Sequence, residues 1–496
     1  MHIVDMLLGR AIAEGIRWLL LSATAQEVLA DQLRAILPPG ADVGPFRLTE
    51  VRFKPGRKIA AYYETFVNTK GPKGNYVRPI AVTWAPNAQA DRHEEMNGTA
   101  KLQAEAISRG VAAPFRQLWT DFHDWNMHVR VSPLDARFSS LVRLSDPKHV
   151  RAMLAKTGLA ESARGLSEYS ITPLKYRPGK SHVLRYDPLD QGIETVFAKL
   201  YIAEDRARLF HREGAERCFR LASTTADWLE ERRGPGRCLR PLAYVAEDAV
   251  VLYPRAEGAP LCDLVQRRVG GLAPWLERAG AALGSLHQMP VELIGPLGPP
   301  HDFAAETRVI ATKSDHIHSL LPQVGSAIQA LLGRACELHE QLPQEPPTFA
   351  HGDLKCEHIW IAPDRLTMMD FDTSRLADPA LDVGYFLADW QFWNVTCHAG
   401  LEKMQEDFLA GYAPGVPQER LMRARLYEAI ELVRCAVRRV QLFEQDWAYR
   451  TAVLVERAQA VLNDLQFSPS SPVSRQPEAS TRPRNKHTST RSIALS

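Results

Sequence analysis

The sequence predicts an α+β protein with two lobes, an antiparallel β-sheet lobe followed by a mostly helical lobe, and with an N-terminal α/β extension. Residues 51–63 and 174–186 each have the pattern of two short strands around a Pro-Gly turn, which is typical of a β-hairpin. Residues 400–466 carry apolar side chains at three- and four-residue spacing, which predicts helices. At 496 residues the chain is long enough for two or three domains.

The composition narrows the class of protein. Hydrophobic residues make up 45% of the chain and charged residues 24%, as in soluble globular proteins. The formal charge of +2 gives no reason to expect nucleic acid or an anionic membrane as a partner. The seven cysteines stand singly, which favours free thiols in a reducing compartment. Because the apolar run in "IRWLLLSA" is too short to span a bilayer, we expect a cytoplasmic protein without a membrane segment.

A repeat lies in the first half of the chain. The segment "VRFKPGRKIAAYY" at 51–63 resembles "LKYRPGKSHVLRY" at 174–186, at a constant offset of 123 residues. The strand after the second copy, "TVFAKLY", contains Lys199, whereas the comparable strand of the first copy, "PIAVTWAP", has no lysine. The duplication therefore predicts a structural first copy and a second copy that carries function.

The turn of the second copy contains Gly179-Lys180-Ser181, a fragment of a phosphate-binding loop. The strict motif needs another glycine five residues before the glycine of Gly-Lys, and that position is Leu174. A hairpin turn with solvated polar residues is the simpler interpretation of this fragment alone.

Further motifs follow in order along the chain. After Lys199 comes a helical segment with Glu213 and Glu216, and then a strand, "DAVVLYPRAEGAPL", that ends in a polar connection. A helix with "ALGSLHQM" precedes "HGDLKCEH" at 351–358, and "LTMMDFDTSRLADPALD" at 366–382 comes soon afterwards.

This order resembles the aminoglycoside phosphotransferase family, within the protein-kinase-like fold. The catalytic loop of that family begins H-G-D, as does His351-Gly352-Asp353. Its metal loop resembles Asp370-Phe371-Asp372, followed by the D-P-x-x-D motif at 378–382. The resemblance covers roughly residues 165–415, and the two loops together at this spacing are far more specific than H-G-D alone.

The resemblance and the repeat together divide the chain into five parts. These are N-terminal helices, a degenerate copy of the N-lobe, a nucleotide-binding N-lobe, a helical C-lobe for catalysis and substrate binding, and a tail. Their boundaries are 1–45, 46–150, 151–255, 256–466 and 467–496. The tail is rich in Ser, Pro, Thr and Arg without apolar periodicity, which predicts disorder.

The resemblance implies ATP and Mg²⁺, or Mn²⁺, as cofactors. Phosphoryl transfer depends mainly on positioning and on neutralising phosphate charge. Asp353 would accept or orient the proton of a substrate hydroxyl, and Asp370 would bind the metal through hard oxygen atoms. Lys199 would contact the nucleotide phosphates as a point charge. Its carboxylate partner would be Glu213 or, three residues later, Glu216.

The same resemblance places other residues around the nucleotide. Ser181 would support the phosphates from the turn, and the backbone around Tyr253 to Arg255 would bind adenine. Taken singly, each of these residues has a structural alternative, such as a solvent-facing strand lysine for Lys199.

Four further residues of the motifs are expected to be structural. In the family pattern Asp382 anchors the catalytic loop and His351 packs against the metal loop. His287 is expected to be a satisfied interior histidine, and Asp372 is expected to be a turn residue rather than a second metal contact.

His358 departs from the family pattern, in which asparagine stands five residues after the aspartate and contacts the metal. A neutral imidazole can accept a metal bond or hydrogen-bond Asp353. Because imidazole is a softer ligand than an amide oxygen, we expect it to bind Mn²⁺ comparatively well. We therefore expect His358 to act as a catalytic contact, as a metal ligand, or as both; the alternative is that the protein has lost one metal site. On this point the sequence is similar to the macrolide phosphotransferases.

The function implied is ATP-dependent transfer of the γ-phosphate to a hydroxyl of a small molecule such as a sugar, a metabolite or an antibiotic-like compound. The alternative is a nucleotide-binding pseudokinase that acts as a regulatory or interaction module. The helices after the metal loop, which select the substrate in the family, carry arginines as well as acids. This argues against a polycationic aminoglycoside. The arginines are Arg425, Arg434, Arg438 and Arg439, and the acids are Glu428 and Glu431.

Overall fold

The computed structural model describes residues 12–69, 75–85, 93–159, 161–162, 165–190, 192–202, 214–397 and 402–467.

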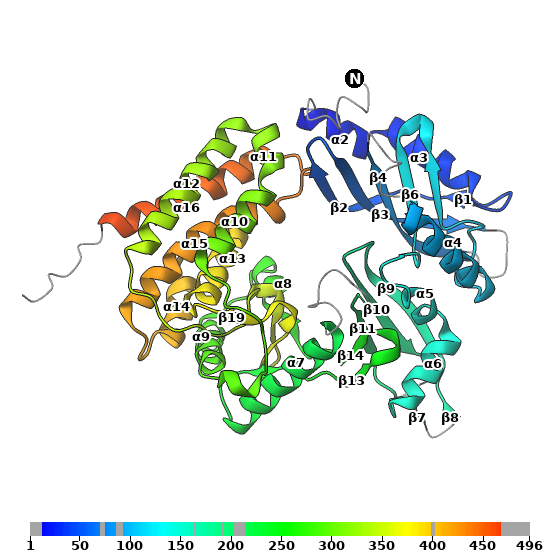
Figure 1. The fold of residues 1–496 in the computed structure, drawn as a ribbon. Helices are drawn as coiled ribbons and strands as arrows, with labels where there is room; N and C mark the ends of the chain where they lie inside the picture. The colour runs from blue at the N-terminus through cyan, green and yellow to red at the C-terminus, as the bar shows by residue number, and fades with distance from the viewer. Residues whose placement is uncertain are drawn as a thin grey trace, which may run out of the picture.

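The first half of the chain builds two antiparallel sheets with the same strand order (Figure 1). The order β2-β3-β4-β6-β5 in the first sheet corresponds to β9-β10-β11-β14-β13 in the second. The first sheet consists of β1 (Asp42–Val43), β2 (Arg47–Lys54), β3 (Lys58–Asn68), β4 (Asn75–Trp84), β5 (Trp119–Phe122) and β6 (Met127–Val131). The second consists of β9 (Tyr169–Arg177), β10 (Ser181–Pro188), β11 (Val196–Leu200), β13 (Ala243–Val245) and β14 (Val250–Pro254).

The turns of the two sheets repeat as well. Gly56 and Gly179 have φ angles of 68° and 72° in the two Pro-Gly turns, a left-handed conformation that glycine adopts without steric cost. Asn126 and Ala249 have φ angles of 45° and 48° before the last strand of each sheet. Both pairs are separated by the 123 residues of the sequence repeat. The repeat therefore extends from the first hairpin through the whole sheet.

Thr83 occupies in the first sheet the position that Lys199 occupies in the second. The residues that pair with Lys199 on its two neighbouring strands lie 123 positions after those that pair with Thr83. These pairing residues are Val183 and Val251 for Lys199, and Ala60 and His128 for Thr83. The first copy thus keeps the sheet and lacks its lysine, as the sequence comparison indicates.

Helices cover the first sheet on both faces. On one face, α2 (Ala13–Leu21), α3 (Ala23–Ala35) and α4 (His93–Ser108) share a hydrophobic core with the sheet. On the other face, Tyr62 and Ala81 belong to a second core that includes the second sheet. The two short helices that follow the first sheet, α5 (Leu141–Leu144) and α6 (Pro147–Lys156), contribute side chains to this second core.

The second half of the chain is mostly helical. Its helices are α8 (Leu261–Gln266), α9 (Ala273–His287), α10 (Phe303–Lys313), α11 (Asp315–Leu320), α12 (Pro322–Glu340), α13 (Ala380–Cys397), α14 (Glu402–Tyr412), α15 (Gln418–Arg438) and α16 (Trp447–Phe467). Helix α7 (Gly214–Glu231) stands between the third and fourth strands of the second sheet. The spacing of apolar residues in 400–466 predicts helices, and α14, α15 and α16 confirm this prediction.

Short strands in the helical lobe hold the two predicted loops. They are β12 (Arg237–Cys238), β15 (Ala259–Pro260), β16 (Thr348–Ala350), β17 (Ile359–Ile361), β18 (Leu366–Met368) and β19 (Arg375–Ala377). The loop with Asp353 leaves β16, and the loop with Asp370 connects β18 to β19. Since β16 pairs with β19 and β17 with β18, the two loops lie side by side.

Parts of two predictions lie outside the described residues. Residues 1–11 of the N-terminal segment and 468–496 of the predicted tail are among them. None of the helices within the described ranges combines the length and apolar character needed to cross a bilayer.

Candidate active site

Asp382 anchors the backbone of the catalytic loop. Its carboxylate accepts hydrogen bonds from the backbone N–H groups of His351 at 2.6 Å and Gly352 at 2.7 Å. His287 lies 3.1 Å from the same carboxylate, and all these groups are buried. Burial opposes ionisation of Asp382, but the hydrogen bond with His287 and nearby charges keep its pKa below the usual value. This geometry agrees with the structural roles expected for Asp382 and His287.

The catalytic and metal loops approach each other at Gly352. Its φ angle is 77°, and a Cβ atom there would lie 2.5 Å from the carbonyl oxygen of Thr373 in the metal loop. His351 reaches the same loop, with its Nε2 atom 3.0 Å from the carbonyl oxygen of Met369 and its ring against Phe371. His351 therefore packs against the metal loop, as expected.

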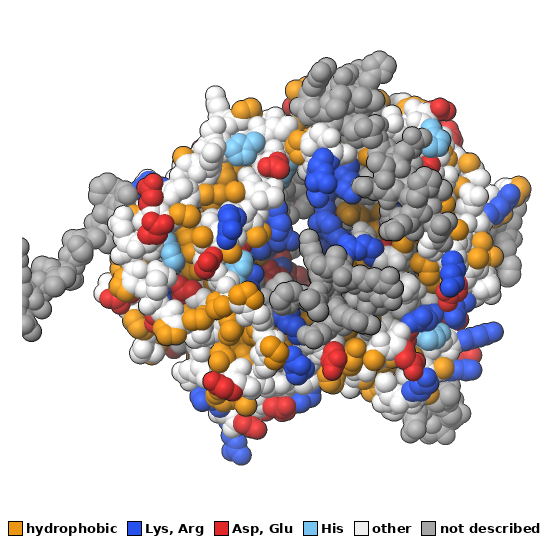
Figure 2. Space-filling model, viewed as in Figure 1, with side chains coloured by type: hydrophobic (Ala, Val, Ile, Leu, Met, Phe, Trp, Pro, Cys, Tyr) orange, Lys and Arg blue, Asp and Glu red, His pale blue; other side chains and the backbone are white. Residues whose placement is uncertain are grey.

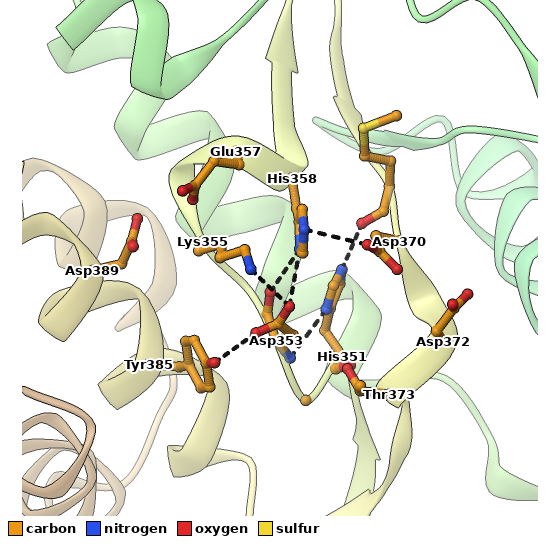
Figure 3. A network of polar contacts seen from close by, with 12 residues as sticks. His351, Asp353, Lys355, Glu357, His358, Asp370, Asp372, Thr373, Tyr385 and Asp389 are labelled. Carbon is orange, nitrogen blue, oxygen red and sulfur yellow. Dashed lines mark hydrogen bonds and ion pairs between the residues drawn. The ribbon is translucent and has the colours of Figure 1, made fainter. Parts of the chain in front are cut away.

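Asp353 is an ionised carboxylate with a donor on each oxygen (Figure 3). The Tyr385 hydroxyl, from α13, donates to Oδ1 at 2.5 Å, and Lys355 Nζ lies 2.9 Å from Oδ2. Burial would raise the pKa of Asp353, but Lys355, His358 and Tyr385 hold it well below its usual range. The site therefore presents a fixed, charged acceptor for a proton.

His358 lies between the two aspartates of the loops. Its Nδ1 atom is 2.8 Å from the carbonyl oxygen of Asp353, so this nitrogen carries the hydrogen and donates it. Its Nε2 atom faces Asp370 Oδ2 at 3.4 Å. Burial lowers the pKa of His358 to about 4, which leaves the ring neutral near pH 7. The lone pair of Nε2 therefore points at a carboxylate oxygen.

The side chain of Lys199 extends from the second sheet to the metal loop. Its Nζ atom lies 2.7 Å from Asp370 Oδ1 and 2.6 Å from Asp372 Oδ2. Burial opposes the charged amine, yet the two carboxylates raise the pKa of Lys199 well above its usual value. Tyr201, two residues after Lys199, donates its hydroxyl to Asp372 Oδ1 at 2.8 Å. Asp372 thus takes part in the charge network, and its interpretation as a turn residue alone is wrong.

The donor set at Asp370 and His358 fits a divalent cation. Two acceptors, Asp370 Oδ2 and the bare Nε2 of His358, face each other at 3.4 Å. Adjacent ligands of an octahedral ion with bonds of about 2.1 Å lie about 3 Å apart. Mg²⁺ is commonly bound by one or two protein ligands together with water and substrate phosphates. Among the described residues, no group of three or more His, Cys, Asp or Glu side chains is placed to hold a metal ion.

The predicted carboxylate partners of Lys199 have different outcomes. Glu213 lies outside the described residues. Glu216 is exposed in the first turn of α7 and makes no ion pair with any described residue. It is therefore not the carboxylate partner of Lys199 in this structure. The aspartates of the metal loop, Asp370 and Asp372, take that place.

The remaining predicted residues lie at or just beyond the ends of two inner strands of the second sheet, β10 and β14. Ser181 begins β10 directly after the Pro-Gly turn. The phenol of Tyr253, at the end of β14, lies near Lys199 and Tyr201, and burial raises its pKa above the usual value. Arg255 is exposed in the connection that follows β14.

Sequence reasoning missed three residues of the site. Lys355 stands two positions after Asp353 in the quoted motif, and Tyr385 stands three positions after Asp382, one helical turn along α13. Asp135 comes from the segment between the two sheets, and its Oδ2 accepts a hydrogen bond from the backbone N–H of Gly179 at 2.6 Å. The first two had a local signal in the motif spacing, whereas Asp135 had none.

The comparison with protein families identifies this part of the chain. Residues 194–428 match the model described as the phosphotransferase enzyme family. The family resemblance predicted from the two loops is confirmed. The chain is a bilobal α+β protein of the protein-kinase-like fold, with an antiparallel sheet lobe, a helical lobe and an additional N-terminal sheet.

Solved structures of three proteins are similar to this chain at low identity. A choline/ethanolamine kinase family protein from Mesorhizobium loti has 15% identity and a TM-score of 0.41, with 64% of this chain and 97% of that chain covered. The GDP and kanamycin complex of an aminoglycoside 2″-phosphotransferase has 15% identity and a TM-score of 0.42, with 63% of this chain and 98% of that chain covered. A macrolide 2′-phosphotransferase from Brachybacterium faecium has 15% identity and a TM-score of 0.38, with 66% of this chain and 99% of that chain covered. A search of curated proteins found no match.

Proposed function

We propose that this protein transfers the γ-phosphoryl group of a nucleoside triphosphate, ATP in the first instance, to a hydroxyl of a small molecule. One observation carries the proposal. Two loops of the helical lobe bring Asp353, His358 and Asp370 together. His358 contacts both aspartates, and Asp370 pairs with Lys199 of the second sheet. Placing an acceptor for a proton beside a phosphate-neutralising site is what phosphoryl transfer requires.

In the proposed reaction Asp353 receives the proton of the attacking hydroxyl. The hydroxyl oxygen forms a bond to the γ-phosphorus, the bond from that phosphorus to the β–γ bridging oxygen breaks, and a nucleoside diphosphate leaves. Tyr385 and Lys355 hold the carboxylate in one orientation, which reduces the cost of positioning the acceptor hydroxyl. The low pKa of Asp353 indicates that its main contribution is orientation, with proton transfer late in the reaction.

Asp370 and His358 would hold Mg²⁺ or Mn²⁺. When bound, the metal neutralises negative charge on the phosphates. The protein's own contribution is to keep Asp370 ionised and His358 neutral, so that a charged oxygen and a lone pair both face the ion. The lone pair of His358 replaces the amide oxygen of the asparagine found in most relatives.

The second sheet would bind the nucleotide. Lys199 would exchange one of its aspartate partners for a phosphate, and Ser181 would support the phosphates from the turn. The backbone from Tyr253 to Arg255 would bind adenine, with Glu213 as a further partner of Lys199. The first sheet, with Thr83 in place of the lysine, would serve as a scaffold.

The location follows from the thiols. Six of the seven cysteines have side chains that the structure describes; all six are free thiols, and five of them are buried. We infer a reducing compartment, the cytoplasm, as the site of action.

A nucleotide-binding pseudokinase is the second candidate, because Lys199 pairs with two carboxylates, those of Asp370 and Asp372. Thermal shift with ATP and Mg²⁺, followed by turnover against a panel of hydroxyl compounds, separates the two functions. An enzyme binds and turns over nucleotide, and Asp353→Asn lowers its transfer rate about a hundredfold while leaving nucleotide affinity nearly unchanged. A pseudokinase binds nucleotide without any acceptor-dependent turnover.

A further inference from the structure

Five basic side chains gather where the two sheets and the helical lobe meet. They are Arg52, Lys175, Arg177, Lys313 and Arg438, and we call them the basic cluster. Figure 2 shows this face of the molecule hollowed at its centre, with Lys and Arg side chains along the hollow. The cluster draws on β2, β9, α10 and α15, so no single element creates it.

The cluster begins on the face of the second sheet that carries Lys199. Lys175 pairs with Val183, and Val183 pairs with Lys199, so the three side chains form one row across the strands. Arg177, two positions after Lys175, lies on the same face. These two residues therefore point to the side of the sheet from which Lys199 reaches Asp370.

Glu50 joins the second sheet to the first. Its carboxylate pairs with Arg177 and, at 2.6 Å, with Nε of Arg52. One buried carboxylate therefore serves two guanidinium groups, and the edge of β2 brings Arg52 alongside β9.

The helical lobe supplies the other side of the cluster. The backbone N–H of Val51 lies 3.4 Å from Oε1 of Gln441, three residues after Arg438, which places the end of α15 next to β2. Lys313 is the last residue of α10, and α11, which follows it, packs against β2. Lys313 and Arg438 thus approach Arg52 from the opposite wall.

The cluster carries more positive charge than its surroundings neutralise. Within the described residues, Lys175, Lys313 and Arg438 form no ion pair, and Arg52 and Arg177 share Glu50. Burial, followed by neighbouring positive charges, lowers the pKa of Lys175 and of Lys313 to about 8. Crowded like charges without a counter-ion cost stability, and a bound anion would offset that cost.

The other arginines of α15 pair with acids, and so does Arg439, the residue directly after the helix. Arg420 and Arg423 pair with Glu345, Arg425 with Glu428, Arg434 with Glu306, and Arg439 with Glu357 and Asp389. Arg438 differs from them: it is exposed, lies near Arg177 and Lys313, and pairs with no acid among the described residues.

The cluster is within reach of a substrate bound at Asp353. Arg434 lies over the ring of Tyr385 at 5.1 Å, and the Tyr385 hydroxyl contacts Asp353. Arg438 is one helical turn farther along α15, about 6 Å along its axis. A small molecule with a hydroxyl at Asp353 can therefore extend its far end to Arg438 and Lys313.

We infer that the acceptor is an anionic hydroxyl compound, whose phosphate or carboxylate binds the basic cluster while its hydroxyl lies at Asp353. This inference rests on the proposed phosphotransferase function and specifies its substrate class. Several unpaired cations from different elements match a phosphate or carboxylate, and they repel the cationic groups of an aminoglycoside or of choline.

Titration calorimetry on the full-length protein, saturated with a non-hydrolysable ATP analogue and Mg²⁺, tests the inference. The probes are four hydroxyl compounds of similar size: glycerol, glycerate, glycerol 3-phosphate and choline. We expect at least one of the two anions to bind about tenfold or more tightly than glycerol and choline. The ratio between glycerate and glycerol 3-phosphate identifies which anion the cluster prefers.

Lys313→Gln and Arg438→Gln should each weaken binding of the preferred anion about tenfold and leave nucleotide affinity unchanged. Both variants should melt at or above the wild-type temperature, because each removes an unpaired like charge. Arg308→Gln is the matched control, an exposed arginine on α10 outside the cluster, and should bind as the wild type does.

The possible failures are distinct. Equal affinity for all four probes, or anion binding that is insensitive to both variants, overturns the anionic acceptor. Loss of nucleotide affinity in the two variants with anion binding intact also overturns it, because the cluster would then belong to the nucleotide site. If the wild type binds no ATP analogue, the proposed phosphotransferase function itself fails.

Discussion

Replacing Tyr385 with phenylalanine removes one hydrogen bond to Asp353 and retains the ring. The hydroxyl lies 2.5 Å from Asp353 Oδ1, and Arg434 stacks on the same ring at 5.1 Å. Because the acceptor is an ionised, largely buried carboxylate, this hydrogen bond contributes about 1.5–3 kcal/mol. Lys355 remains on the other oxygen, so the charge of Asp353 keeps one partner.

We expect Tyr385→Phe to lower the local stability of the catalytic loop by about 1.5–3 kcal/mol. In an Asp353→Asn background the acceptor is neutral, and the same change should cost only about 0.5–1.5 kcal/mol. Native-state hydrogen exchange of the loop amides measures these local free energies without requiring the whole chain to unfold in one step. Four proteins complete the double-mutant cycle.

Two outcomes of the cycle would exclude the proposed role of the Tyr385 hydroxyl. If Tyr385→Phe costs the same in both backgrounds, the hydroxyl stabilises something other than the charge of Asp353. If it costs nothing in either, the contact contributes no stability and the proposed orienting role of Tyr385 is wrong.

Three other predictions follow from the site. Lys199→Ala should abolish the thermal shift produced by ATP and Mg²⁺, whereas Lys58→Ala in the first copy should preserve it; equal losses would place the nucleotide elsewhere. His358→Asn should keep substantial turnover and lower the ratio of Mn²⁺-supported to Mg²⁺-supported activity. His358→Ala should raise the half-saturating metal concentration about tenfold or more. An alanine variant with wild-type metal dependence would show that His358 is not a ligand. Burial and the neighbouring Glu306 raise the pKa of Glu431 to about 8 against the attraction of a nearby arginine. Wild-type stability should therefore fall as pH rises from about 4.5, the ordinary value, to about 8, because the unfolded chain releases this proton first; Glu431→Gln should flatten that decline in thermal unfolding, and an unchanged slope would assign it to another group.

The catalytic and metal loops were predictable because each is a local motif. Asp353 and Asp370 lie 17 positions apart on loops joined by a small sheet, so sequence spacing alone indicates their proximity. The role of Asp382 was predictable for the same reason. From the sequence, only the first hairpin of the repeat was recognisable. The later strands of the two copies have the same register and the same turns, but their sequences are less similar.

The contacts that join distant elements were not predictable. The pairing of Lys199 with Asp372 depends on how the second sheet sits over the metal loop, and no sequence pattern encodes that placement. Tyr385 shares this difficulty, because its hydroxyl reaches Asp353 across 32 positions. The basic cluster is the clearest case: Arg177 and Arg438 carry no common motif, and only the packing of two sheets against α15 brings them together.

Transfer of labelled phosphate from γ-³²P-ATP to a panel of hydroxyl compounds that includes glycerol 3-phosphate and glycerate tests the proposed reaction most directly. With the wild-type protein we expect a labelled phosphate ester. With Asp353→Asn we expect a transfer rate about a hundredfold lower, at nearly unchanged ATP affinity. Product formation by the Asp353→Asn protein at the wild-type rate would show that the proton acceptor lies elsewhere and that Asp353 does not have the proposed role.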